Sequence, residues 1–270
     1  MSPAAVPLQQ GRRIFGSVAE TYAEARPDYP DELYQLLATR CGLQSQTAVL
    51  EIGPGTGLVT KRLLRMGVNS IRAIEPDARL VEFLTRQLPD QALTIDPCSL
   101  EEASLDDKSF DVVVAANSFH WLEQHDALKK VFRVLRPGGW WAMWWMIFST
   151  CGNSDPFQAA TQHLFKDVAP FPGTTVDGIP FGLDRARRRD DLRQAGFIET
   201  RIAQWRWHVT YDTARLIALY NTFSPLWTLA EEGRFALLRQ LADIAERDFH
   251  GNVKKTFVTV CYTARRPCLT

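Results

Sequence analysis

The most chemically suggestive part of the chain is a glycine-rich turn between two acids. Gly53, Gly55 and Gly57 follow Glu51 in the run EIGPGTG, and Glu75 stands 20 residues after Gly55. Glycines let a ligand approach the backbone closely because they carry no side chain. An acid at that distance is placed to accept hydrogen bonds from ribose hydroxyls. The turn and its acids therefore predict a site for a nucleoside-containing cofactor.

The details of the turn separate two kinds of cofactor. A dinucleotide fingerprint has the pattern GxGxxG, but here Leu58 occupies the third glycine's position and Gly57 comes one residue early. Glu51 would also repel a pyrophosphate and attract a cation. S-adenosylmethionine carries a sulfonium and an ammonium group and no phosphate, so the local charge favours it. The alternative is an ordinary glycine turn with two unrelated surface acids.

A second polar segment, NSFHW at 117–121, follows an apolar, strand-like run. In open α/β sheets ligands bind beyond the carboxyl ends of the strands, which places His120 where a substrate would lie. The imidazole is interpreted as a catalytic group, either a general base or a hydrogen-bond donor that orients the substrate. The alternative is that His120 only fixes the start of a helix. Trp121 is expected in the pocket wall or in the core.

Strand-like and helical patterns alternate along the first half of the chain. Their connections are too long for hairpins, which is typical of βαβ units in a parallel sheet covered by helices on both faces. Strands are expected at 47–52, 70–74, 92–95, 111–116 and 140–148, with helices at 56–66, 76–88 and 126–135. The second half is expected to hold a loop-rich segment with one short helix at 149–182, helices at 184–195, 212–223 and 229–249, a long strand at 197–209 and a final edge strand at 256–263.

This order of elements predicts one α/β domain over residues 1–270, with a doubly wound, Rossmann-like sheet. Its expected parts are an N-terminal lid at about 1–30, a cofactor-binding core at 31–148, acceptor-side insertions at 149–255 that include a core helix and strand at 184–209, and the final strand at 256–264.

Composition limits the classes of partner. Lys plus Arg number 31 and Asp plus Glu number 31, so no overall basic field for nucleic acid is expected. The apolar heart of the longest uncharged stretch, 140–148, is far shorter than the roughly 20 residues of a membrane span. The five cysteines form no CxxC pair and no secretory signal is visible. We therefore expect a cytoplasmic protein without a metal, and leave its oligomeric state open.

Three runs, EIGPGTG at 51–57, FDVVVAANSFHWL at 110–122 and LRPGGWWAMWW at 135–145, together with Glu75, resemble class I S-adenosylmethionine-dependent methyltransferases. The segment FGSVAETYAEARPDYP at 15–30 and the tail motifs from residue 224 are similar to a small-molecule subfamily related to trans-aconitate methyltransferase. The resemblance implies S-adenosylmethionine as the cofactor. It also implies a seven-stranded, mostly parallel sheet with the last strand antiparallel and a helical lid.

The resemblance assigns cofactor contacts residue by residue. Glu75 would hold the ribose, Pro76 or Asp77 would touch the adenine edge, and Asn117 would lie near the methionine end. The remaining assigned contacts lie in the glycine-rich turn, the adenine loop and the lid: Glu51, Gly53, Pro54, Gly55, Thr56, Gly57, Ser99, Leu100, Tyr22 and Arg26. Cys98 departs from the family, which often has glycine there, and this bears on the backbone shape of the adenine loop.

The acceptor is expected to be a small molecule methylated on oxygen, nitrogen or carbon. Its pocket is expected to include Tyr29, Ser118, Trp121, Trp145, Tyr220 and Phe223. A bulky or apolar acceptor is one interpretation of the aromatic residues Phe165, Phe171, Phe181, Tyr220, Phe223 and Trp227. The alternative is that they only pack a helical lid, which would also carry such residues. Two other functions stay open: a nicotinamide- or flavin-dependent oxidoreductase, and an inactive binding protein with a methyltransferase fold.

Overall fold

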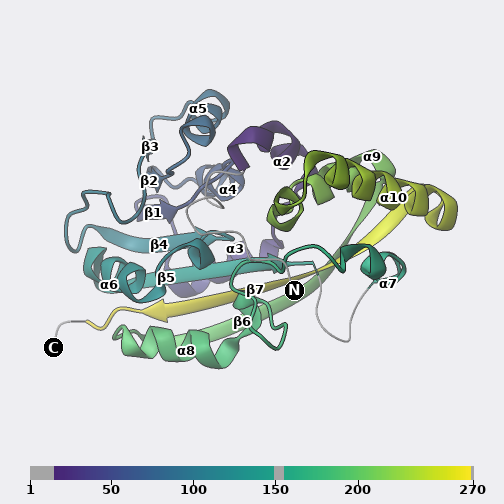
Figure 1. Ribbon diagram of the computed structural model, residues 1–270. Helices are drawn as coiled ribbons and strands as arrows, with labels where there is room; N and C mark the ends of the chain where they lie inside the picture. The colour runs from purple at the N-terminus through teal and green to yellow at the C-terminus, as the bar shows by residue number, and fades with distance from the viewer. Residues whose placement is uncertain (1–14, 149–154, 269–270) are drawn as a thin grey trace.

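The computed structural model describes residues 15–148 and 155–268. The first 14 residues of the expected lid and residues 149–154 of the expected insertion lie outside these ranges. Seven strands form one sheet in the order β3-β2-β1-β4-β5-β7-β6 (Figure 1). The strands are β1 (Ala48–Ile52), β2 (Ser70–Ile74), β3 (Leu93–Asp96), β4 (Phe110–Ala116), β5 (Leu135–Ile147), β6 (Ile198–Asp212) and β7 (Asn252–Arg265).

The pairing pattern confirms the predicted sheet. β3, β2, β1, β4 and β5 pair in parallel, and β7 pairs antiparallel with both β5 and β6. The fold is thus a Rossmann-like, mostly parallel sheet whose last strand in sequence is antiparallel. A parallel sheet of this kind directs the carboxyl ends of β1, β2, β4 and β5 to one rim, which is where ligands bind.

The prediction of an edge strand at 256–263 is wrong, because β7 lies inside the sheet and β6 forms the edge. The threonines at 256, 259 and 263 in the run TFVTVCYT suggested a solvent-facing side. Both Thr259 and Thr263 are nevertheless buried, and each accepts a hydrogen bond at 2.9 Å, from Trp207 Nε1 and Arg40 Nε respectively. A hydroxyl whose hydrogen bond is satisfied can be buried at little cost, so the polar positions did not mark an exposed face.

Helices cover both faces of the sheet, as predicted. Residues of α3 (Asp31–Cys41) and α4 (Leu58–Arg65) share a core with Val112 and Trp144. Residues of α6 (Gln124–Val134) and α8 (Arg185–Gln194) share the other core with Trp141 and Trp145. The tryptophans of β5 therefore alternate between the two faces, because successive side chains of a strand point to opposite sides.

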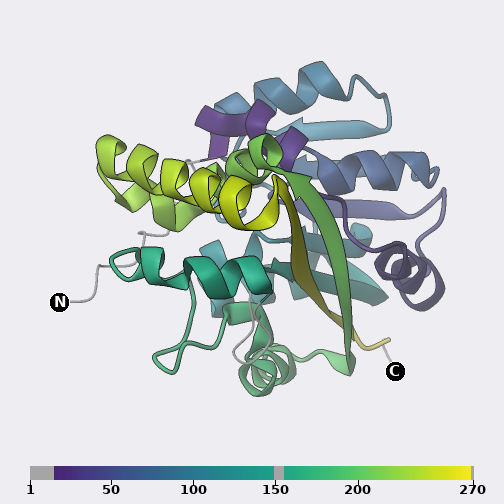
Figure 2. The same ribbon diagram turned by 90° about the vertical axis from the view of Figure 1, so that its right-hand side faces the viewer.

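The two longest strands carry the helices that cover the cavity rim. β6 and β7 run side by side well beyond the shorter strands (Figure 2). Their far ends continue into α9 (Thr213–Asn221) and α10 (Glu231–Phe249). The N-terminal α2 (Ala19–Ala25), preceded by the 3₁₀ turn η1 (Phe15–Val18), lies between α5 (Ala78–Gln87) and α9 (Figure 1). Across the described ranges, no helix has the length and apolar character that a membrane crossing requires.

Candidate active site

A cavity of about 580 Å³ opens at the carboxyl ends of β1, β2, β4 and β5 and extends under α2, α7 (Pro156–Thr161) and α9. Every residue assigned to cofactor contact, catalysis or the acceptor pocket lines it, except Gly57 and Asp77. Trp227, one of the aromatic residues that favoured an apolar acceptor, does not line it either. The lining set comprises Tyr22, Arg26, Tyr29, Glu51, Gly53, Pro54, Gly55, Thr56, Glu75, Pro76, Ser99, Leu100, Asn117, Ser118, His120, Trp121, Trp145, Tyr220 and Phe223.

The three glycines of the turn have different roles. All three have left-handed backbones, with φ of 68°, 59° and 80° at Gly53, Gly55 and Gly57. A Cβ at Gly57 would lie 2.2 Å from Leu84 Cδ1, so this glycine permits close packing of α4 on α5. A Cβ at Gly55 would meet nothing within 4 Å. Gly55 therefore leaves open the floor of the cavity, where a ligand could approach the backbone.

Replacing Gly55 with alanine should destabilise the fold by only about 1–2 kcal/mol, the usual cost of a left-handed L-residue. The new methyl group should however project into the ligand's space and abolish S-adenosylhomocysteine binding. Gly42→Ala is the matched control, because Gly42 has φ of 67°, meets nothing within 4 Å and does not line the cavity. Isothermal titration should find binding lost in the first variant and kept in the second. Equal affinity of the two variants for S-adenosylhomocysteine would show that the ligand does not contact the glycine-rich turn.

Two buried acids, Glu51 and Glu75, line the cavity beside the glycine-rich turn. Glu51 accepts a hydrogen bond from Thr60 Oγ1 at 2.7 Å. Glu75 accepts hydrogen bonds at 3.1 Å from the backbone N–H groups of Gly55 and Asp77. Burial raises the pKa of both carboxyls to about 7, partly offset by these hydrogen bonds. The cavity thus holds two acids that ionise near neutral pH, where a cationic ligand would favour the charged form.

This ionisation predicts a pH-dependent affinity. An acid with a pKa near 7 is about one-tenth ionised at about pH 6 and nine-tenths ionised at about pH 8. S-adenosylhomocysteine, whose ammonium group favours the carboxylate, should therefore bind about tenfold more weakly at the lower pH, with release of protons on binding. Titration calorimetry in buffers of different ionisation enthalpy measures both effects. A pH-independent affinity without proton release would show that neither acid meets the ligand's charge.

The raised pKa values of Glu51 and Glu75 make the ligand-free protein less stable as the pH rises, whereas they make ligand binding stronger. Below the ordinary value of 4.5 the carboxyls are protonated in both the folded and the unfolded chain. As the pH rises toward 7, the unfolded chain releases these protons while the folded chain retains them. The favourable contribution at low pH is thereby lost as the pH rises through the folded pKa. The gain in stability on ligand binding should be largest above pH 7, where the two carboxyls are charged.

Asp77 and Cys98 occupy positions that the resemblance left open. Asp77 caps α5 by accepting a hydrogen bond from Arg79 N at 3.0 Å, and its carboxylate pairs with the Arg79 guanidinium at 2.8 Å. Its side chain is buried and committed to the helix, whereas the neighbouring Pro76 lines the cavity. Among the described residues, those with a positive φ do not include Cys98. The backbone of the loop at 98–101 therefore does not require a glycine at this position.

Asn117 and Ser118 tie the strand ends together beneath the cavity. Asn117 has a left-handed backbone, its Nδ2 donates to the Tyr29 hydroxyl at 2.8 Å, and its Oδ1 accepts from Met146 N at 2.8 Å. Ser118 Oγ donates to the Ile52 carbonyl at 2.6 Å. Both side chains therefore hold β1, β5 and the segment before α3 in register around the site.

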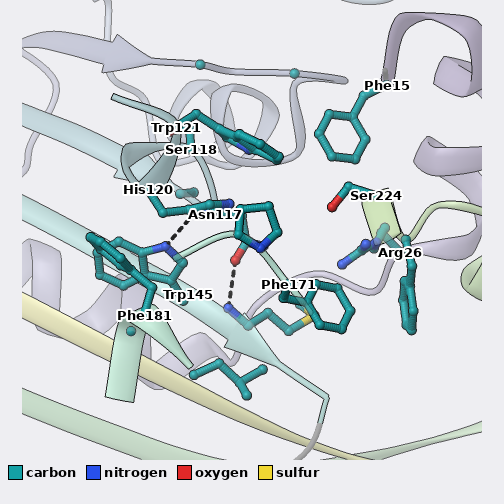
Figure 3. A pocket seen from close by; sticks show the side chains of 18 of the residues that line it. Phe15, Arg26, Asn117, Ser118, His120, Trp121, Trp145, Phe171, Phe181 and Ser224 are labelled. Atoms are coloured by element: carbon teal, nitrogen blue, oxygen red, sulfur yellow. Dashed lines mark hydrogen bonds between the residues drawn. The ribbon is translucent and has the colours of Figure 1, made fainter. Parts of the chain in front are cut away.

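His120 lies in an aromatic niche at the acceptor side (Figure 3). Trp145 Nε1 donates a hydrogen bond to His120 Nδ1 at 3.0 Å. The imidazole centroid lies 4.9 Å from the Trp121 ring and 6.1 Å from the Phe181 ring. Burial lowers the pKa of His120 to about 3. The ring is therefore neutral throughout the physiological pH range.

The lining of the acceptor side differs from the one that the sequence alone indicated, and it includes polar residues. Of the aromatic residues expected there, Trp227 does not line the cavity: its Nε1 donates to the Asn221 carbonyl at 2.9 Å, and Arg234 stacks on its ring at 3.9 Å. The sequence interpretation missed several lining residues, namely Phe15, Phe148, Gln158, Gln162, Ser224 and Lys255. Phe15 is also an aromatic of the expected lid, and its ring lies 6.4 Å from that of Trp121.

Lys255 had no sequence signal because its partner is remote in the chain. Its Nζ lies 2.8 Å from Asp155 Oδ2, and both side chains are buried. Asp155 also caps α7 through the N–H of Gln158 at 2.7 Å. The ion pair fixes α7 on β7 at the far end of the cavity. No cluster of three or more metal-ligating side chains occurs in the part of the chain that the structure describes.

Comparisons with known proteins agree with this geometry. Residues 50–143 match the family model described as a methyltransferase domain. An uncharacterised methyltransferase of Schizosaccharomyces pombe is 26% identical over 86% of this chain and 87% of its own length. One from Mycobacterium tuberculosis is 35% identical over 48% of this chain, which spans about half (51%) of that relative. A solved putative type II methyltransferase from Anaeromyxobacter dehalogenans, 18% identical, superposes with a TM-score of 0.67 over 90% of this chain and 99% of its own.

The fold, the glycine-rich turn and these matches define a methyltransferase enzyme with a Rossmann-like fold. These findings support a class I S-adenosylmethionine-dependent methyltransferase. Its residues fit that cofactor, because Gly55 leaves backbone open to the cavity and Glu51 and Glu75 supply negative charge beside it.

Proposed function

We propose that the chain methylates a small, largely apolar acceptor and belongs to the subfamily related to trans-aconitate methyltransferase. The observation that carries the proposal is one continuous cavity, in which the glycine-rich turn with its two acids opens into an aromatic chamber. A chamber lined by Trp121, Trp145, Phe181 and Phe223 suits an apolar body better than a charged polymer. Oxygen, nitrogen and carbon nucleophiles all stay within the proposal.

The cofactor supplies an electrophilic methyl group when it is bound. Glu75 would hold its ribose hydroxyls, with Pro76, Ser99 and Leu100 along the adenine, and Glu51 would face its cationic end. The remaining work of the chain is alignment and exclusion of water, because methyl transfer depends on the approach of the nucleophile in line with the methyl group. The aromatic chamber provides a dry wall for that approach, and residues 15–30 would act as its lid.

Equilibrium binding tests the cofactor and separates the competing functions. S-adenosylhomocysteine at 100 times its dissociation constant should stabilise the protein by about 2.7 kcal/mol, measured as a thermal shift. A shift with NADH and none with S-adenosylhomocysteine would indicate the oxidoreductase instead. A screen with methyl-labelled S-adenosylmethionine against small apolar acids, amines and phenols then tests turnover. Binding without transfer to any acceptor would favour the inactive binding protein.

A further inference from the structure

We infer that His120 is a fixed, neutral hydrogen-bond donor that presents Nε2–H to the methyl acceptor, and that Trp145 is the positioning residue that keeps the ring in this form. The identity of the bound molecule rests on the proposed function, whereas the state of the ring does not. Both roles follow from one contact, the hydrogen bond at 3.0 Å from Trp145 Nε1 to His120 Nδ1 (Figure 3).

The direction of this hydrogen bond is fixed by chemistry. An indole nitrogen is a donor only, so His120 Nδ1 must offer its lone pair. A neutral imidazole carries a single N–H, which must then lie on Nε2. Protonating Nδ1 would bring two N–H groups face to face and leave both without an acceptor. The contact therefore selects one tautomer and opposes the imidazolium form.

The surroundings of the ring reinforce this selection. The side chains around His120 are the aromatic rings of Trp121, Trp145 and Phe181, which do not titrate. On α8, behind Phe181, lies Arg188, whose guanidinium is 3.7 Å from the Phe181 centroid and pairs with Asp191 at 2.7 Å. The other charged groups that line the cavity are Glu51, Glu75, Arg26 and Lys255. A cation beyond Phe181 adds no stabilisation to an imidazolium.

Trp145 is itself held rigidly, as a positioning residue must be. It is buried, and its ring lies 5.2 Å from Phe181 and 6.1 Å from Tyr262. The turn η4 (Phe181–Leu183) approaches so closely that a Cβ on Gly182 would lie 2.9 Å from Trp145 Cβ. Tyr262 fastens that turn by donating its hydroxyl hydrogen to the Gly182 carbonyl at 2.7 Å.

The second ring nitrogen of His120, Nε2, differs from Nδ1 in its hydrogen bonding. His120 lines the cavity, and Nε2 has no protein partner in the ranges that the structure describes. A donor in an otherwise aromatic niche selects a ligand that carries a hydrogen-bond-accepting oxygen or nitrogen on an apolar body. A ring with its Nδ1 lone pair engaged and its Nε2 protonated does not remove a proton from the acceptor. Any proton that the acceptor's nucleophilic atom must lose therefore goes to a group other than His120.

Nitrogen NMR of the full chain tests the state of the ring directly. In protein labelled with ¹⁵N-histidine, two-bond proton–nitrogen spectra should show His120 as the Nε2–H tautomer from about pH 5.5 to about pH 8.5, with or without S-adenosylhomocysteine. His120→Gln assigns the signals. An Nδ1–H tautomer, or an imidazolium within this range, would overturn the inference whether or not the cofactor binds.

A matched pair of variants tests the role of Trp145. Trp145→Phe should release the ring, so that both tautomers appear and the titration moves toward the ordinary histidine range. Trp207→Phe is the control, because Trp207 Nε1 also donates a hydrogen bond, at 2.9 Å to Thr259 Oγ1, but lies outside the cavity lining. An unchanged His120 spectrum in the first variant would refute the positioning role.

Turnover of an acceptor found by the screen separates donor from base. The side-chain amide of His120→Gln can replace Nε2–H as a donor but cannot act as a base, so kcat should fall by no more than about tenfold. His120→Phe keeps an aromatic ring and removes the donor, and kcat should fall by about 100-fold, the scale of losing one oriented donor. Equal loss in both variants, with S-adenosylhomocysteine binding retained, would support a base and overturn the donor.

Discussion

Replacing Glu75 with glutamine is expected to raise the dissociation constant of S-adenosylhomocysteine by about 10- to 150-fold, or about 1.5–3 kcal/mol. The two carboxylate oxygens already accept the N–H groups of Gly55 and Asp77 at 3.1 Å. Their remaining lone pairs are the ones available for ribose hydroxyls. An amide would turn one acceptor into a donor that faces a backbone N–H, so the variant loses ligand contacts and loosens the turn together.

Titration calorimetry measures the loss of affinity, and thermal unfolding without ligand separates it from the loss of stability. Glu82→Gln is the control, because Glu82 is an exposed acid on the neighbouring helix α5 and does not line the cavity. It should bind the ligand as the unmodified protein does. An unchanged dissociation constant in Glu75→Gln would show that Glu75 serves only to shape the turn.

The grouping of the residues assigned to the cofactor in one cavity was predictable, because their signals are local in the sequence. Glu51 lies near the end of β1, Gly53 and Gly55 lie in the turn that follows, and Glu75 comes directly after β2. Parallel strands order such residues along one rim whatever the rest of the chain does. The same local logic placed His120 and Asn117 at the end of β4. Their partners Trp145 and Tyr29 required the three-dimensional fold.

The acceptor half was less predictable because its contacts join remote segments. Lys255 and Asp155 are 100 residues apart, and each alone would be expected at the surface. Trp227 shows the reverse error: an aromatic residue in a cavity-covering region instead packs against Arg234. Side-chain type therefore indicated the character of this region, but the turns that end α9 and begin α10 decided which residues face inward.

The contact between Arg26 of the N-terminal segment and Thr222 at the end of α9 is expected to be important for turnover. Arg26 Nε donates to Thr222 Oγ1 at 2.9 Å, and its guanidinium lies 4.7 Å from the Phe148 ring and 4.8 Å from the Tyr22 ring. Arg26→Ala removes this link and a cation from the cavity wall. We expect kcat/KM to fall by about 100-fold, the scale of a small misplacement of the reacting groups.

Arg40→Ala is the matched control for this change. Arg40 Nε donates to the hydroxyl of Thr263 at 2.9 Å and stacks on Trp140 at 4.7 Å, but Arg40 does not line the cavity. Its loss removes a similar hydrogen bond and a similar ring contact. Both variants should lose stability, and only Arg26→Ala should lose most of its turnover. A comparable loss of turnover in the two variants would show that Arg26 affects turnover only by stabilising the fold.

Hydrogen exchange tests whether this segment closes over bound ligand. α2 has seven residues, too few for an isolated helix, so its order depends on what it contacts. Ala19 packs against Leu80 and Phe83, Ala25 is fully buried, and Arg26 adds a link to α9. Ligand in the cavity would add contacts to Tyr22 and Arg26, and S-adenosylhomocysteine with acceptor should therefore raise the protection of residues 15–26.

Arg26→Ala should cancel this gain in protection, while Arg40→Ala should keep it. Equal protection with and without ligands in the unmodified protein would mean that the helix is permanently docked, and the lid would have to be abandoned.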